Sequence, residues 1–167
     1  MPEKIELVSF DNVDKSVPIA LYFTGSFNPP TTGHLMALIE AASELEAKGY
    51  TVDRLYISPS HDDYINKYKK YDPLSNKQPR PIINADLRLE MFNALLSQMK
   101  EHYQANSAIL VQLNKLKVSS YESDLDRFVD HHLLVKNFST EKDKSRESKK
   151  KENRQIVYLA GADLPCC

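Results

Sequence analysis

Cysteine is almost missing from this sequence of 167 residues. Its two cysteines, Cys166 and Cys167, stand next to each other at the very end. Adjacent cysteines rarely bridge each other, and there is no third cysteine with which either could pair. The sequence is therefore not that of a disulfide-stapled secreted domain, and a reducing compartment, the cytoplasm or else the nucleus, is expected.

Long apolar runs and an excess of charge of either sign are also missing. No apolar stretch approaches the ~18 residues that a membrane-spanning helix requires. Residues 1–15 lack the apolar segment of a signal peptide. Lys and Arg number 22 against 23 Asp and Glu, so the formal net charge is −1. These features predict no membrane partner and no nucleic-acid partner held mainly by phosphate contacts.

What remains has the composition of a single globular domain over residues 1–167, with 41% hydrophobic and 27% charged residues. Strand and helix patterns alternate along it with short connections, which predicts βαβ units. The strands are expected at Val17–Phe23, Val52–Ser58, Ala108–Leu113 with an extension toward Val118, and Gln155–Ala160, with a short edge strand at Ile5–Ser9. This order predicts a Rossmann-like open parallel sheet that stops after its fourth strand.

Three helices are expected to cover both faces of that sheet. The first runs from Gly33 to Lys48 and ends at Gly49 in a left-handed cap. The second begins at the capping residue Asn84 and runs to Tyr103. The third covers Leu125–Phe138. In the second helix, the spacing predicts that four apolar residues face the core: Leu87, Met91, Leu95 and Met99.

Two polar stretches interrupt this pattern. Residues 59–81 predict a long loop with several prolines and lysines, and loops of this length in a compact domain usually serve a function. Residues 139–154 contain the basic run Lys149-Lys150-Lys151 and no apolar side chain. They predict a flexible, solvated linker within the domain.

The most informative stretch is Thr24–Leu35, where an apolar strand breaks at Gly25 and a helical pattern begins at Leu35. The first N–H groups of a helix have no partners within it, so a strand, a glycine turn and a helix start together present backbone donors to an anion. His34 falls in the first helical turn, where its ring can add another donor. The stretch predicts a phosphate site.

Polar segments follow the other predicted strands as well, starting at Ser58, Tyr121 and Gly161. Ligands of an open parallel sheet bind at the carboxyl ends of its strands, where the strand order reverses. These segments are therefore expected to share one rim with Gly25–His34 and to form one site.

The residues Gly25-Ser26-Phe27-Asn28-Pro29 and Thr31-Thr32-Gly33-His34 resemble the GxFxP…(H/T)xGH motif of the nucleotidyltransferase superfamily. Asn after Phe and Thr in the first His position are similar to the eukaryotic-type nicotinamide/nicotinate mononucleotide adenylyltransferase family in particular. The plainer alternative is an ordinary turn shaped by Gly and Pro. The strand–turn–helix context favours the motif.

The resemblance implies roles for matching residues along the rest of the chain. Ser58-Pro59, Asp63-Tyr64 and Tyr68-Lys69-Lys70 are similar to the family's loop after the second strand, with Lys70 as the predicted phosphate ligand and Lys67 or Lys69 as alternatives. Val118-Ser119-Ser120-Tyr121-Glu122-Ser123 resembles Val-Asp-x-Trp-Glu-Ser. Arg88 matches the arginine of a helix in the family, although a surface ion pair with Asp86 or Glu90 is an equal alternative.

The predicted site follows from these matches. The resemblance assigns catalysis to His34, Lys70 and Arg88. It assigns mononucleotide binding to Ser26, Tyr121 and Glu122. It assigns ATP binding to the first motif and to the last strand end: Gly25, Ser26, Phe27, Thr31, His34, Gly161 and Asp163. It assigns no metal ligand.

The reaction that the resemblance implies is direct nucleotidyl transfer. The phosphate of nicotinamide or nicotinate mononucleotide attacks the α-phosphorus of ATP, and NAD, or its deamido form, and pyrophosphate result. Mg²⁺ accompanies ATP as the expected cofactor. No covalent protein nucleophile is needed, so positioning and electrostatics supply the catalysis.

The resemblance covers residues 17–163, and no counterpart of the family's later Ile-Ser-(S/T)-x-x-Arg segment follows Asp163. Three interpretations stay open: an adenylyltransferase completed by a second subunit, for instance in a homo-oligomer; a noncatalytic nucleotide-binding module; and the product of a longer reading frame cut short. A cytidylyltransferase or a pantetheine-phosphate adenylyltransferase is the alternative among enzymes. Tyr121-Glu122-Ser123 and Asn28 favour the nicotinamide branch.

Overall fold

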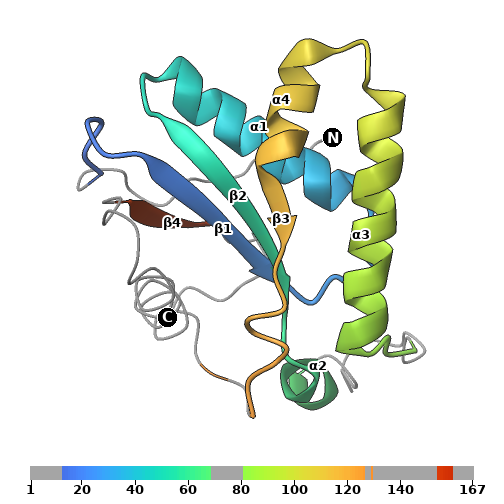
Figure 1. The fold of residues 1–167 in the computed structure, drawn as a ribbon. Coiled ribbons are helices and arrows are strands. Elements are labelled where there is room, and N and C mark those ends of the chain that lie inside the picture. The colour runs from blue at the N-terminus through green and yellow to red at the C-terminus, as the bar shows by residue number, and fades with distance from the viewer. Residues whose placement is uncertain (1–12, 69–80, 127–128, 130–153, 160–167) are drawn as a thin grey trace, which may run out of the picture.

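A four-stranded parallel sheet forms the centre of the computed structural model, which describes residues 13–68, 81–126, 129 and 154–159 (Figure 1). Its strand order is β3-β2-β1-β4, and every neighbouring pair is parallel. The strands are β1 Ile19–Gly25, β2 Val52–Pro59, β3 Leu116–Val118 and β4 Gln155–Leu159. The predicted open parallel sheet is confirmed.

The described residues contain four helices, which lie between β1 and β3. Helix α1, Thr32–Ala47, links β1 to β2, and α2 Asp62–Tyr68, α3 Ala85–His102 and α4 Ser107–Lys115 lie between β2 and β3. The spacing of three and four along α1 buries one face of it, which includes Leu35, Leu38 and Leu45. Gly49 follows the helix with φ +91°, which is the left-handed conformation that the sequence predicted there.

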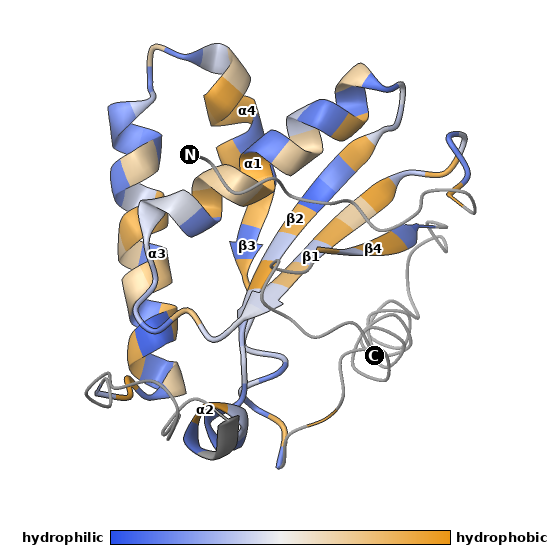
Figure 2. Ribbon diagram, turned by 180° about the vertical axis from the view of Figure 1, so that it is seen from behind, coloured by the Kyte–Doolittle hydropathy of each residue, from blue (hydrophilic) through white to orange (hydrophobic). Residues whose placement is uncertain are grey.

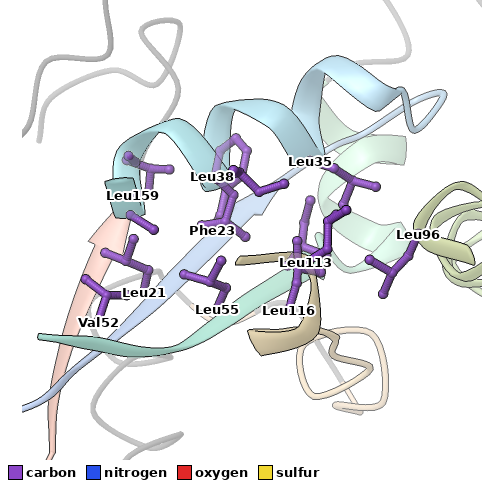
Figure 3. Close-up of a cluster of buried hydrophobic side chains, with 14 of the residues drawn as sticks. Leu21, Phe23, Leu35, Leu38, Val52, Leu55, Leu96, Leu113, Leu116 and Leu159 are labelled. Carbon is purple, nitrogen blue, oxygen red and sulfur yellow. The ribbon is translucent and has the colours of Figure 1, made fainter. Parts of the chain in front are cut away.

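The main hydrophobic core lies between one face of the sheet and helices α1, α3 and α4 (Figure 3). Alternate residues of β1, namely Ile19, Leu21 and Phe23, point into it, because successive side chains of a strand point to opposite faces. In Figure 2 hydrophobic colour runs along much of β1, whereas β2 and β3 also carry hydrophilic residues.

The opposite face of the sheet carries a second cluster, built on Ala20, Tyr22 and Tyr56. Tyr121 and Tyr158 pack against it. The helix predicted over Leu125–Phe138 does not begin where predicted, because Leu125, Asp126 and Val129 are not helical. The rest of that range lies outside the described residues.

The strand predicted at Ala108–Leu113 is wrong, because these residues belong to helix α4. The side chain of Asn106 accepts a hydrogen bond from the backbone N–H of Ile109 at 3.2 Å and so caps the helix start. A short apolar run fits a strand and a buried helix equally well, and the cap decides between them. Only the predicted extension, Leu116–Val118, is a strand.

The buried face of α3 also differs from the predicted one. Its N-cap is Asn84, as predicted, with the side chain accepting from the N–H of Leu87 at 2.9 Å. However, Leu87 is 47% exposed, whereas Arg88, Phe92 and Leu96 are buried. Of the four residues predicted to face the core, Met99 is buried as predicted. The observed buried face lies about one residue from the predicted one and includes the fully buried Arg88.

Several predictions concern residues outside the described part of the chain. They include the edge strand at Ile5–Ser9, Cys166 and Cys167, and the predicted linker except for its last residue. That residue, Arg154, donates to Asp53 at 2.5 Å and is therefore held against β2. The long loop predicted over 59–81 contains α2. Among the described residues, no helix is long and apolar enough to cross a bilayer.

Candidate functional site

The carboxyl ends of the strands meet at one rim, where the site was predicted. The order β3-β2-β1-β4 reverses at β1, since β2 and β3 lie on one side of it and β4 on the other. Ligands of open parallel sheets bind at this switch point. The turn at 26–31 leaves β1 there, and α2 lies beyond the ends of β1 and β2 (Figure 1).

Two aromatic contacts shape the turn after β1. A Cβ atom on Gly25 would lie 3.1 Å from the ring of Phe27, so a glycine lets that ring fold back over the strand end. Phe27 has φ +45°, which is unfavourable for a residue with a side chain. Its ring is buried at centroid distances of 5.2 Å from Phe23 and 4.9 Å from Phe92. This packing holds the strained backbone in place.

His34 stands in the first turn of α1 with one ring nitrogen engaged. Its Nδ1 accepts a hydrogen bond from the backbone N–H of Thr31 at 3.0 Å, and the hydroxyl of Thr31 lies 2.9 Å from the same atom. Burial lowers the pKa of the ring, so it is neutral at pH 7. A neutral imidazole that accepts at Nδ1 carries its proton on Nε2.

Arg88 is fully buried at the base of the rim and binds protein groups. Its Nε donates to the carbonyl of Ile83 at 3.0 Å, and Nη1 donates to that of Ser26 at 2.9 Å. Its Nη2 donates to the carbonyl of Ser60 at 2.8 Å and to Oδ1 of Asp62 at 2.6 Å. Burial lowers the pKa of the guanidinium, and the carboxylate of Asp62 opposes that effect. The surface ion pair considered for Arg88 is not formed.

Asp62 and Asn28 complete the links between these loops. The second oxygen of Asp62 accepts from the N–H of Ala85 at 3.2 Å, so the start of α2 is joined to the start of α3. Asn28 donates to the carbonyl of Pro81 at 3.0 Å and accepts from the N–H of Ile83 at 2.9 Å. The turn after β1 is thus fastened to the segment before α3 by both an amide and a guanidinium.

Glu122 lies in the turn after β3 with its side chain fully buried. Its Oε2 accepts a hydrogen bond from the hydroxyl of Thr24 at 2.5 Å. Burial raises the pKa of the carboxyl to about 7, although the bonds from Thr24 and from the N–H of His61, and the charge of Arg88, favour ionisation. The carboxyl therefore titrates near neutral pH at the end of β1.

His61 ties α2 to the same turn. Its Nδ1 accepts from the N–H of Asp63 at 3.1 Å, so Nε2 donates to the carbonyl of Leu125 at 2.9 Å. The side chain is only 13% exposed. In the sequence nothing distinguished His61 from a surface histidine, yet in the fold it connects the loops after β2 and β3.

The structure thus brings part of the predicted site together. Ser26, Thr31, His34 and Arg88 belong to one set of connected loops, and Glu122 is joined to it through Thr24. Tyr121 packs against the tyrosine cluster under this rim. The other assigned residues, Lys70, Gly161 and Asp163, lie outside the described residues, and the side chain of Lys67 does as well.

Three residues of the rim escaped the sequence reasoning: Thr24, His61 and Asp62. A weak signal existed for Asp62, because Asp62-Asp63 after a strand is a common helix start. Thr24 and His61 gave none, since their partners are 98 and 64 residues away in sequence.

Comparison with known proteins identifies a family and relatives of this chain. A model of the cytidylyltransferase-like family matches residues 22–157. The chain is 28% identical over 165 residues to a nicotinamide/nicotinic acid mononucleotide adenylyltransferase from Arabidopsis thaliana, an alignment that covers 98% of this chain. A protein of the same name from Oryza sativa subsp. japonica is 49% identical over 47 residues, which are 28% of this chain and 19% of that protein.

One solved structure is similar to the chain as well. It is nicotinic acid mononucleotide adenylyltransferase from Plasmodium falciparum, complexed with NaAD, with a TM-score of 0.48 and 16% identity. The match covers 85% of this chain and 50% of that one. The chain spans 58% of the length of the Arabidopsis relative.

Proposed function

This chain belongs to the cytidylyltransferase-like family, and from that premise we propose that it joins ATP to nicotinamide or nicotinate mononucleotide and releases pyrophosphate. The observation that carries the proposal is the position of His34. It lies at a helix start beside the end of β1, is kept neutral by burial, and accepts a hydrogen bond at Nδ1. A helix start with an additional ring donor suits a bound phosphate.

The choice of substrates rests on the named relatives. The Arabidopsis and rice proteins carry the name nicotinamide/nicotinic acid mononucleotide adenylyltransferase, and the first of them aligns with almost the whole of this chain. We extend that substrate pair to this chain as a proposal. The motif at Gly25–His34 supports the ATP side of it, and Tyr121-Glu122-Ser123 supports the mononucleotide side.

In the proposed reaction, a phosphate oxygen of the mononucleotide forms a bond to the α-phosphorus of ATP. The bond between the α-phosphorus and the oxygen that bridges it to the β-phosphate breaks, and pyrophosphate leaves with that oxygen. Negative charge grows on the leaving group, where preorganised donors help most. The Nε2–H of His34 and the first N–H groups of α1 supply such donors, while the network around Arg88 holds the turn that carries them.

Mg²⁺ enters this proposal as part of the substrate Mg-ATP. In residues 13–68, 81–126 and 154–159, no three His, Cys, Asp or Glu side chains lie close enough together to hold a metal ion. The proposal therefore gives the ion its oxygen ligands from the nucleotide phosphates, which suit its preference for hard oxygen donors. Lys70 and Asp163 keep the roles that the family resemblance implies.

The test is pyrophosphate release by the purified chain with Mg-ATP, with each mononucleotide in turn. Release is expected only when a mononucleotide is present. His34→Ala is expected to lower kcat by roughly 100-fold, the usual effect of removing one preorganised donor. His102→Ala is the matched control, because His102 is an exposed histidine at the far end of α3.

Other results would contradict the proposal in recognisable ways. Saturable ATP binding without pyrophosphate release would make the chain a noncatalytic nucleotide-binding module. Pyrophosphate release with CTP and none with ATP would mean that the chain transfers a cytidylyl group instead of an adenylyl group. Equal activity of His34→Ala and the unmodified chain would show that His34 has no role in the reaction.

A further inference from the structure

The buried side chain of Arg88 binds the loops of the rim at three different points. The carbonyls of Ser26, Ser60 and Ile83 come from the turn after β1, the loop after β2 and the segment before α3. None of these bonds reaches a second residue of α3 itself. One guanidinium therefore joins three segments that are separate in the sequence.

The direction of these bonds has a consequence for the backbone. A trans peptide unit is planar, and its C=O and N–H point in opposite directions. When Arg88 holds the carbonyl of Ser26, the N–H of Phe27 must point away from the guanidinium. When it holds the carbonyl of Ser60, the N–H of His61 points away in the same manner, and that N–H favours ionised Glu122.

The geometry points to Arg88 as a positioning residue, which aims the Phe27 N–H of the phosphate turn and the His61 N–H beside Glu122 without touching substrate. This inference rests on the proposed function for its catalytic consequence. Its structural part does not depend on that function. It also replaces the catalytic role that the family resemblance assigned to Arg88, because the side chain is fully buried and all three of its nitrogens donate to protein groups.

Charge and shape both require an arginine in this place. The guanidinium is planar and spreads its five N–H groups in a fixed fork, so it can meet three carbonyls and a carboxylate at once. A lysine would keep the charge opposite Asp62 but would offer a single ammonium. Arg88→Lys is therefore the informative change, since it preserves the ion pair while it releases at least one of the carbonyls.

The chain offers a matched control in a second buried pair. Arg154 donates to Asp53 at 2.5 Å, where β4 begins and far along β2 from the rim. Arg154→Lys makes the same chemical change to a partly buried arginine. Arg154→Lys should lower the free energy of unfolding without displacing the loops of the rim.

The test begins with amide ¹H–¹⁵N spectra of the full chain and both variants, which need no activity. In Arg88→Lys the amides of Phe27 and His61 are expected to shift more than those of residues at equal distance from position 88. In Arg154→Lys they should stay in place. Amides of Phe27 and His61 that shift no further in Arg88→Lys than in Arg154→Lys would overturn the inference.

The second readout is kinetic and is taken well below the unfolding temperature of each variant. Arg88→Lys is expected to lower kcat by 10- to 100-fold, as a small misplacement of catalytic groups does, with a much smaller change in KM for ATP. Free guanidinium should restore part of the kcat of Arg88→Ala but not of His34→Ala. A rise in KM with unchanged kcat would instead indicate direct substrate binding and overturn the positioning role.

The two failures can be told apart. If the unmodified chain releases no pyrophosphate, the proposed function fails, and the amide shifts still decide whether Arg88 orients the two peptide units. If the unmodified chain is active and the shifts are absent, only the inference about Arg88 fails.

Discussion

At the scale of the residue, one backbone hydrogen bond decides which nitrogen of His34 carries the proton. Nδ1 accepts from the N–H of Thr31, and burial against Phe27 and Phe92 keeps the ring neutral. The free nitrogen is then a donor, which is the form that stabilises an anion. Because the donor is the backbone N–H, a substitution of Thr31 by any residue other than proline keeps it.

We predict that His34 populates only the Nε2-protonated tautomer above its pKa, which burial places below the usual value for histidine. Long-range ¹H–¹⁵N spectra distinguish the tautomers directly. Thr31→Val should leave the result unchanged, because it keeps the N–H and removes only the hydroxyl. The exposed ring of His102 is the reference and should exchange between its two neutral tautomers. A pattern with the proton on Nδ1 of His34 would contradict the assignment of the donor.

At the scale of the element, the sequence predicted β1, α1, β2 and β4 to within two residues at each end. These elements carry strong local signals: an apolar run that ends at Gly25, a 3.6-residue period, and a glycine at 49 with positive φ. The strand prediction for Ala108–Leu113 was wrong because periodicity cannot distinguish a short buried helix from a strand. The decisive cap at Asn106 lies outside the apolar run.

Helix α3 illustrates a second limit. The predicted stripe of Leu87, Met91, Leu95 and Met99 is apolar throughout, whereas the observed buried face contains Arg88. A sequence reader places an arginine outside, since charged residues are rarely buried unless paired. Three of its four partners sit on loops that are 26 to 62 residues away in sequence, which no local pattern reveals.

The corrected face of α3 makes a prediction about stability. Phe92→Ala removes a fully buried ring that packs on Phe27, and it should lower the free energy of unfolding by about 3–5 kcal/mol. Leu87→Ala should change it by less than about 0.5 kcal/mol, because Leu87 is 47% exposed. Urea unfolding monitored by circular dichroism measures both. A larger loss of stability in Leu87→Ala than in Phe92→Ala would instead support the face of α3 that was predicted from the spacing.

At the scale of the whole molecule, the rim is held together by buried polar groups, whereas the helices are held by the hydrophobic core. Arg88 and His61 join the loops, and Glu122 binds the end of β1 through Thr24. Buried polar groups of this kind are stable only while each keeps its partners and its protonation state. The stability of the fold and the state of the site are therefore coupled through pH.

The shifted pKa of Glu122 determines whether stability rises or falls with pH. Its pKa is raised from 4.5 to about 7 by burial, and the charged or titratable groups that face it are Arg88, Tyr22 and Tyr158. Between these two pH values the folded chain binds more protons than the unfolded chain. The free energy of unfolding therefore falls as pH rises from about 4.5 to about 7, by roughly 3 kcal/mol, and is flat above that range as far as Glu122 is concerned.

Glu122→Gln tests this directly, because the amide keeps the size of the side chain and an oxygen that can accept from Thr24, but cannot ionise. We predict that the variant loses most of the fall in stability between pH 4.5 and 7 and is more stable than the unmodified chain at pH 8. Urea unfolding at a series of pH values measures the difference. Glu101→Gln, at an exposed position of α3, should leave the pH profile intact. A Glu122→Gln profile parallel to that of the unmodified chain would mean that the carboxyl is already ionised at pH 5, and that Arg88 and the His61 N–H outweigh the effect of burial.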